Sequence, residues 1–127
     1  MITRLTAVKK AEKKWGKLLD LASQEKLDWV KLTKAMYVGC GLCQYSDEHG
    51  EYSEHREYSE HRECSECPLY PDMCNAGVTL KQSLPLYYVI RMQIVIADIS
   101  QRSELLANIT TMYKAIKERG LKWVVTK

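Results

Sequence analysis

The chain lacks phenylalanine altogether and has only three prolines and six glycines in 127 residues. It also lacks an apolar run of about 18 residues, which a membrane-spanning helix needs, and its first residues lead directly into a lysine-rich stretch. The sequence therefore predicts neither secretion nor a membrane span, and it favours a cytoplasmic protein. Hydrophobic residues make up 46%, with three Trp and eight Tyr, which is enough for the core of a single domain over residues 1–127.

Motifs for enzymatic chemistry are missing too. The sequence has no glycine-rich phosphate-binding loop. It also has no Ser, His and Asp residues whose spacing indicates a catalytic triad. His61-x-Glu63 matches the start of a zinc-deaminase signature, but that chemistry needs a separate Pro-Cys-x-x-Cys downstream, whereas Cys64 follows here at once. Nucleases of the HNH type need His and Asn outside their cysteine knuckles, and no His follows His61. We therefore expect a protein that is not an enzyme.

The net charge of +3 hides an uneven distribution along the chain. Residues 1–38 carry nine Lys and Arg against four Asp and Glu, a balance of +5. Residues 39–74 have a balance of −7, and residues 75–127 again have +5. The chain can therefore present surfaces of opposite sign to partners, or bring basic helices and an acidic loop together.

Apolar periodicity predicts a mainly α fold with two helices in residues 1–38. Between Arg4 and Ser23, apolar residues recur at three- and four-residue steps, which predicts an amphipathic helix. They are Leu5, Val8, Trp15, Leu19 and Ala22. Asp28 is a suitable N-cap for a short second helix, which carries Trp29, Leu32 and Met36 on one side and stops near Gly39.

A third helical segment is predicted over residues 83–119. A four-three alternation of apolar positions runs from Tyr88 to Ile116 and indicates one long helix, or two joined near Ser100. It comprises Tyr88, Met92, Val95, Ile99, Leu106, Ile109, Tyr113 and Ile116. Gly120 is expected to end it. A buried strand at residues 87–96 is the alternative, because that run is rich in β-branched and aromatic residues.

A tandem repeat of identical hexamers, Glu-Tyr-Ser-Glu-His-Arg, occupies residues 51–56 and 57–62. Side chains six residues apart do not share a helical face, so the repeat does not build a helix. Lengthening an exposed loop costs little, about 0.6 kcal/mol for each doubling. We therefore expect an expandable acidic loop over residues 45–63, with a specific role for its His and Glu side chains as the alternative.

Five cysteines lie in the middle of the chain. Cys40-Gly41-Leu42-Cys43 and Cys64-Ser65-Glu66-Cys67 are C-x-x-C pairs separated by twenty residues, at the upper limit of two-knuckle zinc spacing. Two pairs supply four thiolates in a tetrahedron, which suits zinc. Residues 39–74 are therefore predicted to form an inserted metal-binding segment that holds one structural zinc ion. Four protein ligands leave no open coordination position, which argues against metal-assisted hydrolysis.

Cys74 is a fifth candidate ligand. It can replace Cys64 in the metal shell or lie beside the site as a buried thiol, and the sequence leaves both open. An iron-sulfur cluster, and buried or redox-active thiols without a metal, are the alternatives to zinc. His49, His55 and His61 are further potential ligands, but His55 and His61 lie in the repeat and His49 lies in the related segment 45–50 that precedes it, so exposed loop histidines are preferred.

The cysteine segment resembles small phage- and prophage-encoded proteins of unknown function. The resemblance rests on Cys40-x-Leu42-Cys43, a variable loop, Cys64-x-x-Cys67-Pro68-Leu69, Cys74, and the aromatic stretch from Pro85 to Tyr88. In that family a Trp-containing N-terminal helix precedes the cysteine core and a C-terminal helix follows it. The repeat at 51–62 of this chain departs from that pattern as an insertion. The resemblance implies a phage setting, hence the host cell cytoplasm, and it implies no activity.

Two classes of binding function remain. The first is a non-catalytic accessory or regulatory protein that binds another protein, with a homodimer through the C-terminal helix as one possibility. The second is a nucleic-acid-binding protein that uses a lysine stripe on the N-terminal helix. That stripe comprises Lys9, Lys10, Lys13, Lys14 and Lys17. Glu12 and Asp20 interrupt it, and a solvated helix face is its plainer interpretation.

Overall fold

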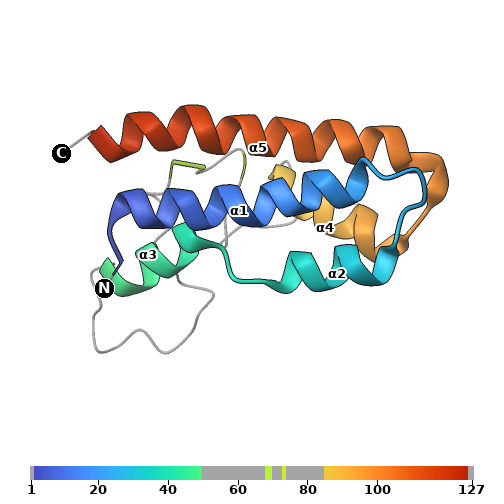
Figure 1. Ribbon diagram of the computed structural model, residues 1–127, viewed down its shortest axis with the longest axis horizontal. Coiled ribbons are helices and arrows are strands. Elements are labelled where there is room, and N and C mark those ends of the chain that lie inside the picture. The colour runs from blue at the N-terminus through green and yellow to red at the C-terminus, as the bar shows by residue number, and fades with distance from the viewer. Residues whose placement is uncertain (1, 50–67, 70–72, 74–84, 126–127) are drawn as a thin grey trace.

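Helix α1 (Arg4–Ala22) is the central element of the fold, because α2, α3 and α5 all pack against it (Figure 1). The computed structural model describes residues 2–49, 68–69, 73 and 85–125. The other helices are α2 (Trp29–Tyr37), α3 (Gly41–His49), α4 (Leu86–Ile96), the 3-10 helix η2 (Ile99–Gln101) and α5 (Arg102–Val125). No strand occurs in the described ranges. The predicted mainly α fold is therefore confirmed, and the alternative strand at residues 87–96 is wrong.

Side-chain caps fix where the first two helices begin. The Thr3 side chain accepts a hydrogen bond from the amide of Thr6 at 3.2 Å at the start of α1. Asp28 caps α2 as predicted, accepting from the amide of Lys31 at 3.0 Å. Such caps satisfy backbone N–H groups that have no partner inside the helix. The first two predicted helices are confirmed with boundaries within two residues of those expected.

The helices are arranged around α1 on two sides. Helix α5 runs antiparallel beside α1, while α3 and α2 lie along the other side of α1, near its N-terminal and C-terminal halves (Figure 1). Helix α4 contacts both α2 and α5. This arrangement leaves one face of α4 without a neighbouring helix among the described elements.

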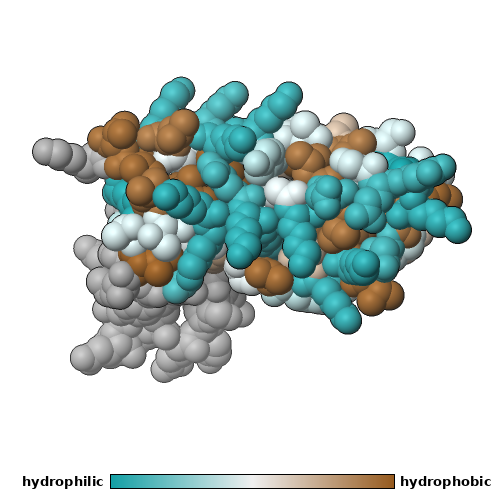
Figure 2. Space-filling model, in the orientation of Figure 1, coloured by the Kyte–Doolittle hydropathy of each residue, from teal (hydrophilic) through white to brown (hydrophobic). Residues whose placement is uncertain are grey.

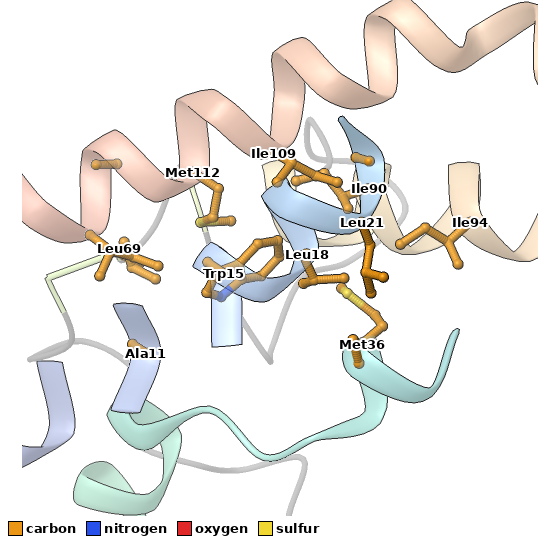
Figure 3. Close-up of a cluster of buried hydrophobic side chains, with 14 of the residues drawn as sticks. Ala11, Trp15, Leu18, Leu21, Met36, Leu69, Ile90, Ile94, Ile109 and Met112 are labelled. Atoms are coloured by element: carbon orange, nitrogen blue, oxygen red, sulfur yellow. The ribbon is translucent and has the colours of Figure 1, made fainter. Parts of the chain in front are cut away.

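One hydrophobic cluster joins all of these helices. Trp15 and Leu18 of α1 lie at its centre, each at most 1% exposed, with Ile109 and Met112 of α5 beside them (Figure 3). Other buried members are Leu32 and Met36 of α2, Leu42 of α3, Ile90 and Ile94 of α4, and Leu69. Leu5 was expected on the apolar face of the first helix but is 47% exposed, whereas Ala7, Ala11 and Leu18 are buried. The buried stripe of α1 is therefore rotated relative to the predicted one.

The C-terminal segment forms two helices, as one of the two predicted arrangements requires. Ala97 has a left-handed backbone with φ of 55° and ends α4. The Asp98 carboxylate then accepts hydrogen bonds from the amide and hydroxyl of Ser100, at 3.0 and 2.8 Å. These bonds also lower the pKa of Asp98. The chain thus turns locally and restarts as η2 and α5.

The apolar stripe predicted for the C-terminal segment is exposed over most of α4. Met92, Val95 and Ile99 of this stripe are 50%, 67% and 60% exposed, and α4 instead buries Ile90, Gln93 and Ile94. In α5 the same alternation does predict buried positions, Ile109 and Ile116. The buried Gln93 is compensated, because its side-chain oxygen accepts a hydrogen bond from Asn108 at 3.1 Å.

Gly120 does not end the last helix. Helix α5 continues to Val125, and Gly120 is buried against α1. A Cβ atom at this position would lie 2.8 Å from Cγ1 of Val8. Glycine therefore permits the close approach of α1 and α5 here, rather than terminating the helix.

Candidate metal centre

The first C-x-x-C pair lies at the start of a helix rather than in a tight turn. The carbonyl oxygen of Cys40 accepts the hydrogen bond of the Gln44 amide at 3.0 Å, so Cys40 directly precedes α3 and Cys43 lies in its first turn. Residues three apart share one side of a helix, which brings the two thiols into contact. The predicted loop at residues 45–63 is wrong for its first residues, since α3 extends to His49.

Close packing against α1 fixes the position of this pair. A Cβ atom at Gly41 would lie 2.4 Å from the carbonyl oxygen of Ala7 and 2.6 Å from Cβ of Lys10, so only glycine fits there. Leu42 is 2% exposed and belongs to the core cluster, against which Cys40 also packs. The residues between the two cysteines thus hold the pair against the core.

Helix α3 is also tied to the C-terminal end of α5. The ring of Tyr45 stacks edge-on against Trp123, with centroids 4.9 Å apart. The guanidinium group of Arg4 lies 4.9 Å from the Trp123 ring centroid and donates a hydrogen bond to the Trp123 carbonyl at 2.8 Å. On the α1 side, Lys10 donates to Gln44 at 3.0 Å. The pair therefore lies on a well-supported helix.

The other three cysteines, Cys64, Cys67 and Cys74, lie outside the described residues, as do His55 and His61. Their described neighbours in the chain are held by the core. Leu69, two residues after Cys67, is 3% exposed in the core cluster (Figure 3). Met73, directly before Cys74, donates its amide to the Leu69 carbonyl at 3.0 Å and accepts from the Tyr87 amide at 2.9 Å.

In the part of the chain that the structure describes, no three His, Cys, Asp or Glu side chains lie close enough together to hold a metal ion. Cys40 and Cys43 are the two predicted ligands in that part, and they form no disulfide. They can supply half of a tetrahedral thiolate shell. Zinc at this centre therefore stays a prediction, as does the choice between Cys64 and Cys74.

The environment of Cys40 favours its protonated form when no metal is bound. The hydrogen bond between the two thiols and burial both raise the pKa of Cys40 well above its usual value. The unfolded chain releases this proton at lower pH, near the ordinary thiol pKa of about 8.5. The contribution of this group to the stability of the metal-free protein is therefore complete below that pH and is lost as pH rises.

Alkylation should reveal this shift. In the metal-free protein, we expect iodoacetamide to modify Cys40 several-fold more slowly near neutral pH than in the urea-unfolded chain, because the reagent requires the thiolate. The rate in the folded protein should increase as pH rises. Peptide mass spectrometry after timed quenching measures both rates, and equal rates in the folded and unfolded chains would contradict the prediction.

The predicted lysine stripe on α1 is only partly available to a partner. Lys9, Lys13 and Lys17 are exposed, and hydrophilic side chains cover α1 on the face shown in Figure 2. Lys10 is exposed but hydrogen-bonded to Gln44. Lys14 does not belong to the stripe, because it is 6% exposed and donates a hydrogen bond to the Met36 carbonyl at 2.9 Å.

Comparisons with known proteins give no further assignment. The chain matches no protein-family model, and neither a curated protein nor a solved structure has significant similarity to it. Among the described residues, no helix combines the length and apolar character needed to cross a membrane.

Proposed function

We propose that the protein binds one structural zinc ion through its cysteines and acts as a non-catalytic accessory or regulatory protein. The observation that carries the proposal is the paired thiols of Cys40 and Cys43, held at the start of α3 against the core. The core also anchors Leu69 and Met73, the described neighbours of Cys67 and Cys74. The thiolates of Cys40 and Cys43, with two more from Cys64, Cys67 and Cys74, would complete a closed tetrahedral shell. Such a shell leaves no open coordination position for catalysis.

The zinc proposal is tested by the metal content of cysteine variants. Wild-type protein should contain one zinc per chain by elemental analysis. The double variant Cys40→Ser/Cys43→Ser should contain almost none, because removing two thiolates destroys the shell. Comparing Cys64→Ser with Cys74→Ser identifies the remaining ligand, since only the ligand variant loses zinc. Full zinc content in the double variant would refute the proposal.

The action on a partner rests on charge. Residues 39–74 have a balance of −7, which suits a basic protein surface and repels nucleic acid. Together with the resemblance of the cysteine segment to phage and prophage proteins, this supports a phage-encoded protein that binds a host or phage protein in the host cytoplasm. Zinc in this proposal fixes the geometry of the acidic segment rather than taking part in a reaction.

Nucleic-acid binding is the second candidate function. Lys9, Lys13 and Lys17 recur every four residues on one exposed side of α1, a spacing that could track phosphates. Fluorescence anisotropy with nonspecific duplex DNA at low salt tests it. Binding that weakens steeply with salt and is reduced by Lys13→Glu, but less by Lys34→Glu on α2, would support this function. No retention at low salt would exclude it.

A further inference from the structure

The outward face of α4 carries apolar side chains almost exclusively. Met92, Val95 and Ile96 are 50%, 67% and 61% exposed, and the partly buried Tyr88 lies on the same side of the helix. Ile99, in the 3-10 turn that follows, is 60% exposed. We call these five residues the α4 face. Single exposed apolar residues are ordinary on a protein surface, but a contiguous group of them marks an interaction site.

Three of these residues share one side of α4. Tyr88, Met92 and Val95 follow steps of four and three residues, as heptad positions a and d do, and Ile99 lies beyond the break at Ala97. The core of the protein does not use this stripe, because α4 packs inward through Ile90, Gln93 and Ile94. Helix α4 is therefore apolar on two sides, and a helix of that kind is normally buried on both.

We propose that the α4 face is the interface of a homodimer, in which the α4 helices of two copies pack antiparallel about a two-fold axis. An antiparallel pair brings an a position against a d position of the facing helix. Met92 then packs against the partner subunit's Val95, and the two-fold axis repeats the same contact on the other side. The face is thus complementary to itself, as a closed two-fold interface requires.

Charge at the edge of the α4 face selects the antiparallel orientation. Arg91 is exposed beside the apolar residues, and Asp98 is exposed just beyond the end of the helix. Antiparallel packing with Met92 opposite Val95 brings Arg91 toward the end of the partner helix that Asp98 follows, so opposite charges approach each other at both ends of the pair. Parallel packing would instead keep Arg91 and the partner subunit's Asp98 at different levels along the pair, so the opposite charges would not meet. Rim charges of this kind add little affinity but fix orientation.

A second copy suits this face better than a charged partner does. Within the α4 face, no residue carries a formal charge, so it offers nothing that recognises a strongly charged protein, nucleic acid or headgroup. One helix face is smaller than the roughly 800 Å² per partner of a standard interface, so we expect a dissociation constant on the order of 10 µM. Dimerisation through the α4 face does not require zinc, so the zinc content per chain should be the same in monomeric and dimeric protein.

Sedimentation equilibrium of the full chain under reducing conditions, from about 1 to 300 µM, tests the dimer. The wild type should pass from monomer to dimer across this range. Val95→Glu should raise the dissociation constant at least 100-fold, because it buries a carboxylate in an apolar interface. Val30→Glu on α2 is the matched control, since Val30 is 64% exposed and lies outside the α4 face, and it should leave the constant unchanged.

Mixing charge variants shows whether the partner is a second copy of the same face. Val95→Glu and Met92→Lys should each be monomeric, while their equimolar mixture should associate as a heterodimer, because the two new charges then face each other across the Val95–Met92 contact. Far-UV circular dichroism checks folding, and Val95→Lys with Met92→Glu replaces the pair if either variant unfolds. A monomeric wild type over the whole range, equal weakening by Val30→Glu, or a mixture that stays monomeric would each overturn the proposal.

Discussion

Replacing Lys14 with glutamate is expected to lower the free energy of unfolding by about 3–5 kcal/mol, a large part of the total for a domain of this size. The Lys14 ammonium group donates to the Met36 carbonyl at 2.9 Å. It also lies 5.6 and 5.8 Å from the ring centroids of Trp15 and Tyr87, whose faces attract cations. A carboxylate at this buried position would face the same carbonyl and rings without any attraction to them.

The neighbouring residue provides the control for this prediction. Lys13 is exposed, so Lys13→Glu should change the free energy of unfolding by at most about 0.5 kcal/mol. Urea denaturation followed by far-UV circular dichroism measures both variants. Similar midpoints for Lys14→Glu and Lys13→Glu would show that Lys14 is not the buried link between α1 and α2 described above.

Replacing Gly41 with alanine is expected to lower the free energy of unfolding by about 3 kcal/mol. The Cβ atom of Gly41→Ala would lie 2.4 Å from the backbone carbonyl oxygen of Ala7, an atom that cannot rotate away as a side chain can. Helices α1 and α3 must then separate, and the contacts of Leu42 with the core weaken. Because Cys40 and Cys43 flank this position, zinc affinity should fall as well.

Gly39 provides a matched substitution two residues away. A Cβ atom there meets nothing within 4 Å, and no glycine among the described residues has a positive φ. Gly39→Ala should therefore be neutral or stabilise the protein by up to about 1 kcal/mol, through a less flexible unfolded chain. If thermal unfolding shows that both variants lose stability equally, then α3 does not pack on α1 through Gly41.

Local signals in the sequence were sufficient to predict α1, α2 and the C-terminal helices, but not α3. The amphipathic period between Arg4 and Ser23 predicts α1, and Asp28 caps α2 as expected. The break near Ser100 was one of two open alternatives, and the left-handed Ala97 settles it. Capping and periodicity depend on residues close together in the chain, which explains why the sequence alone reveals them.

Features that depend on contacts between distant residues were missed. The sequence does not show that Val8 approaches Gly120, so it predicts Gly120 as a helix end. It also does not show that Lys14 donates a hydrogen bond to the Met36 carbonyl, so it predicts Lys14 as part of a surface stripe. The four-three alternation marks buried positions in α5, but in α4 it marks the exposed side. The pattern identifies an apolar stripe and not which neighbour covers it.

The candidate site was predicted in part. C-x-x-C spacing singled out Cys40 and Cys43, and the structure places them together against the core. Their setting at the start of α3 was not predicted, because the C-x-x-C spacing indicates a zinc knuckle and not a helix. The sequence signal that could have revealed the helix is the apolar Leu42 between the two cysteines. Leu42 is buried, so it faces the core while the two thiols lie together on another side of the helix.

Metal content combined with thiol counting tests the central claim most directly. The purified wild-type protein should contain one zinc ion per chain by elemental analysis, and a chelator should make four thiols newly reactive toward a thiol reagent. Iron in place of zinc, or no metal together with thiols that react equally before and after chelation, would contradict a structural zinc site.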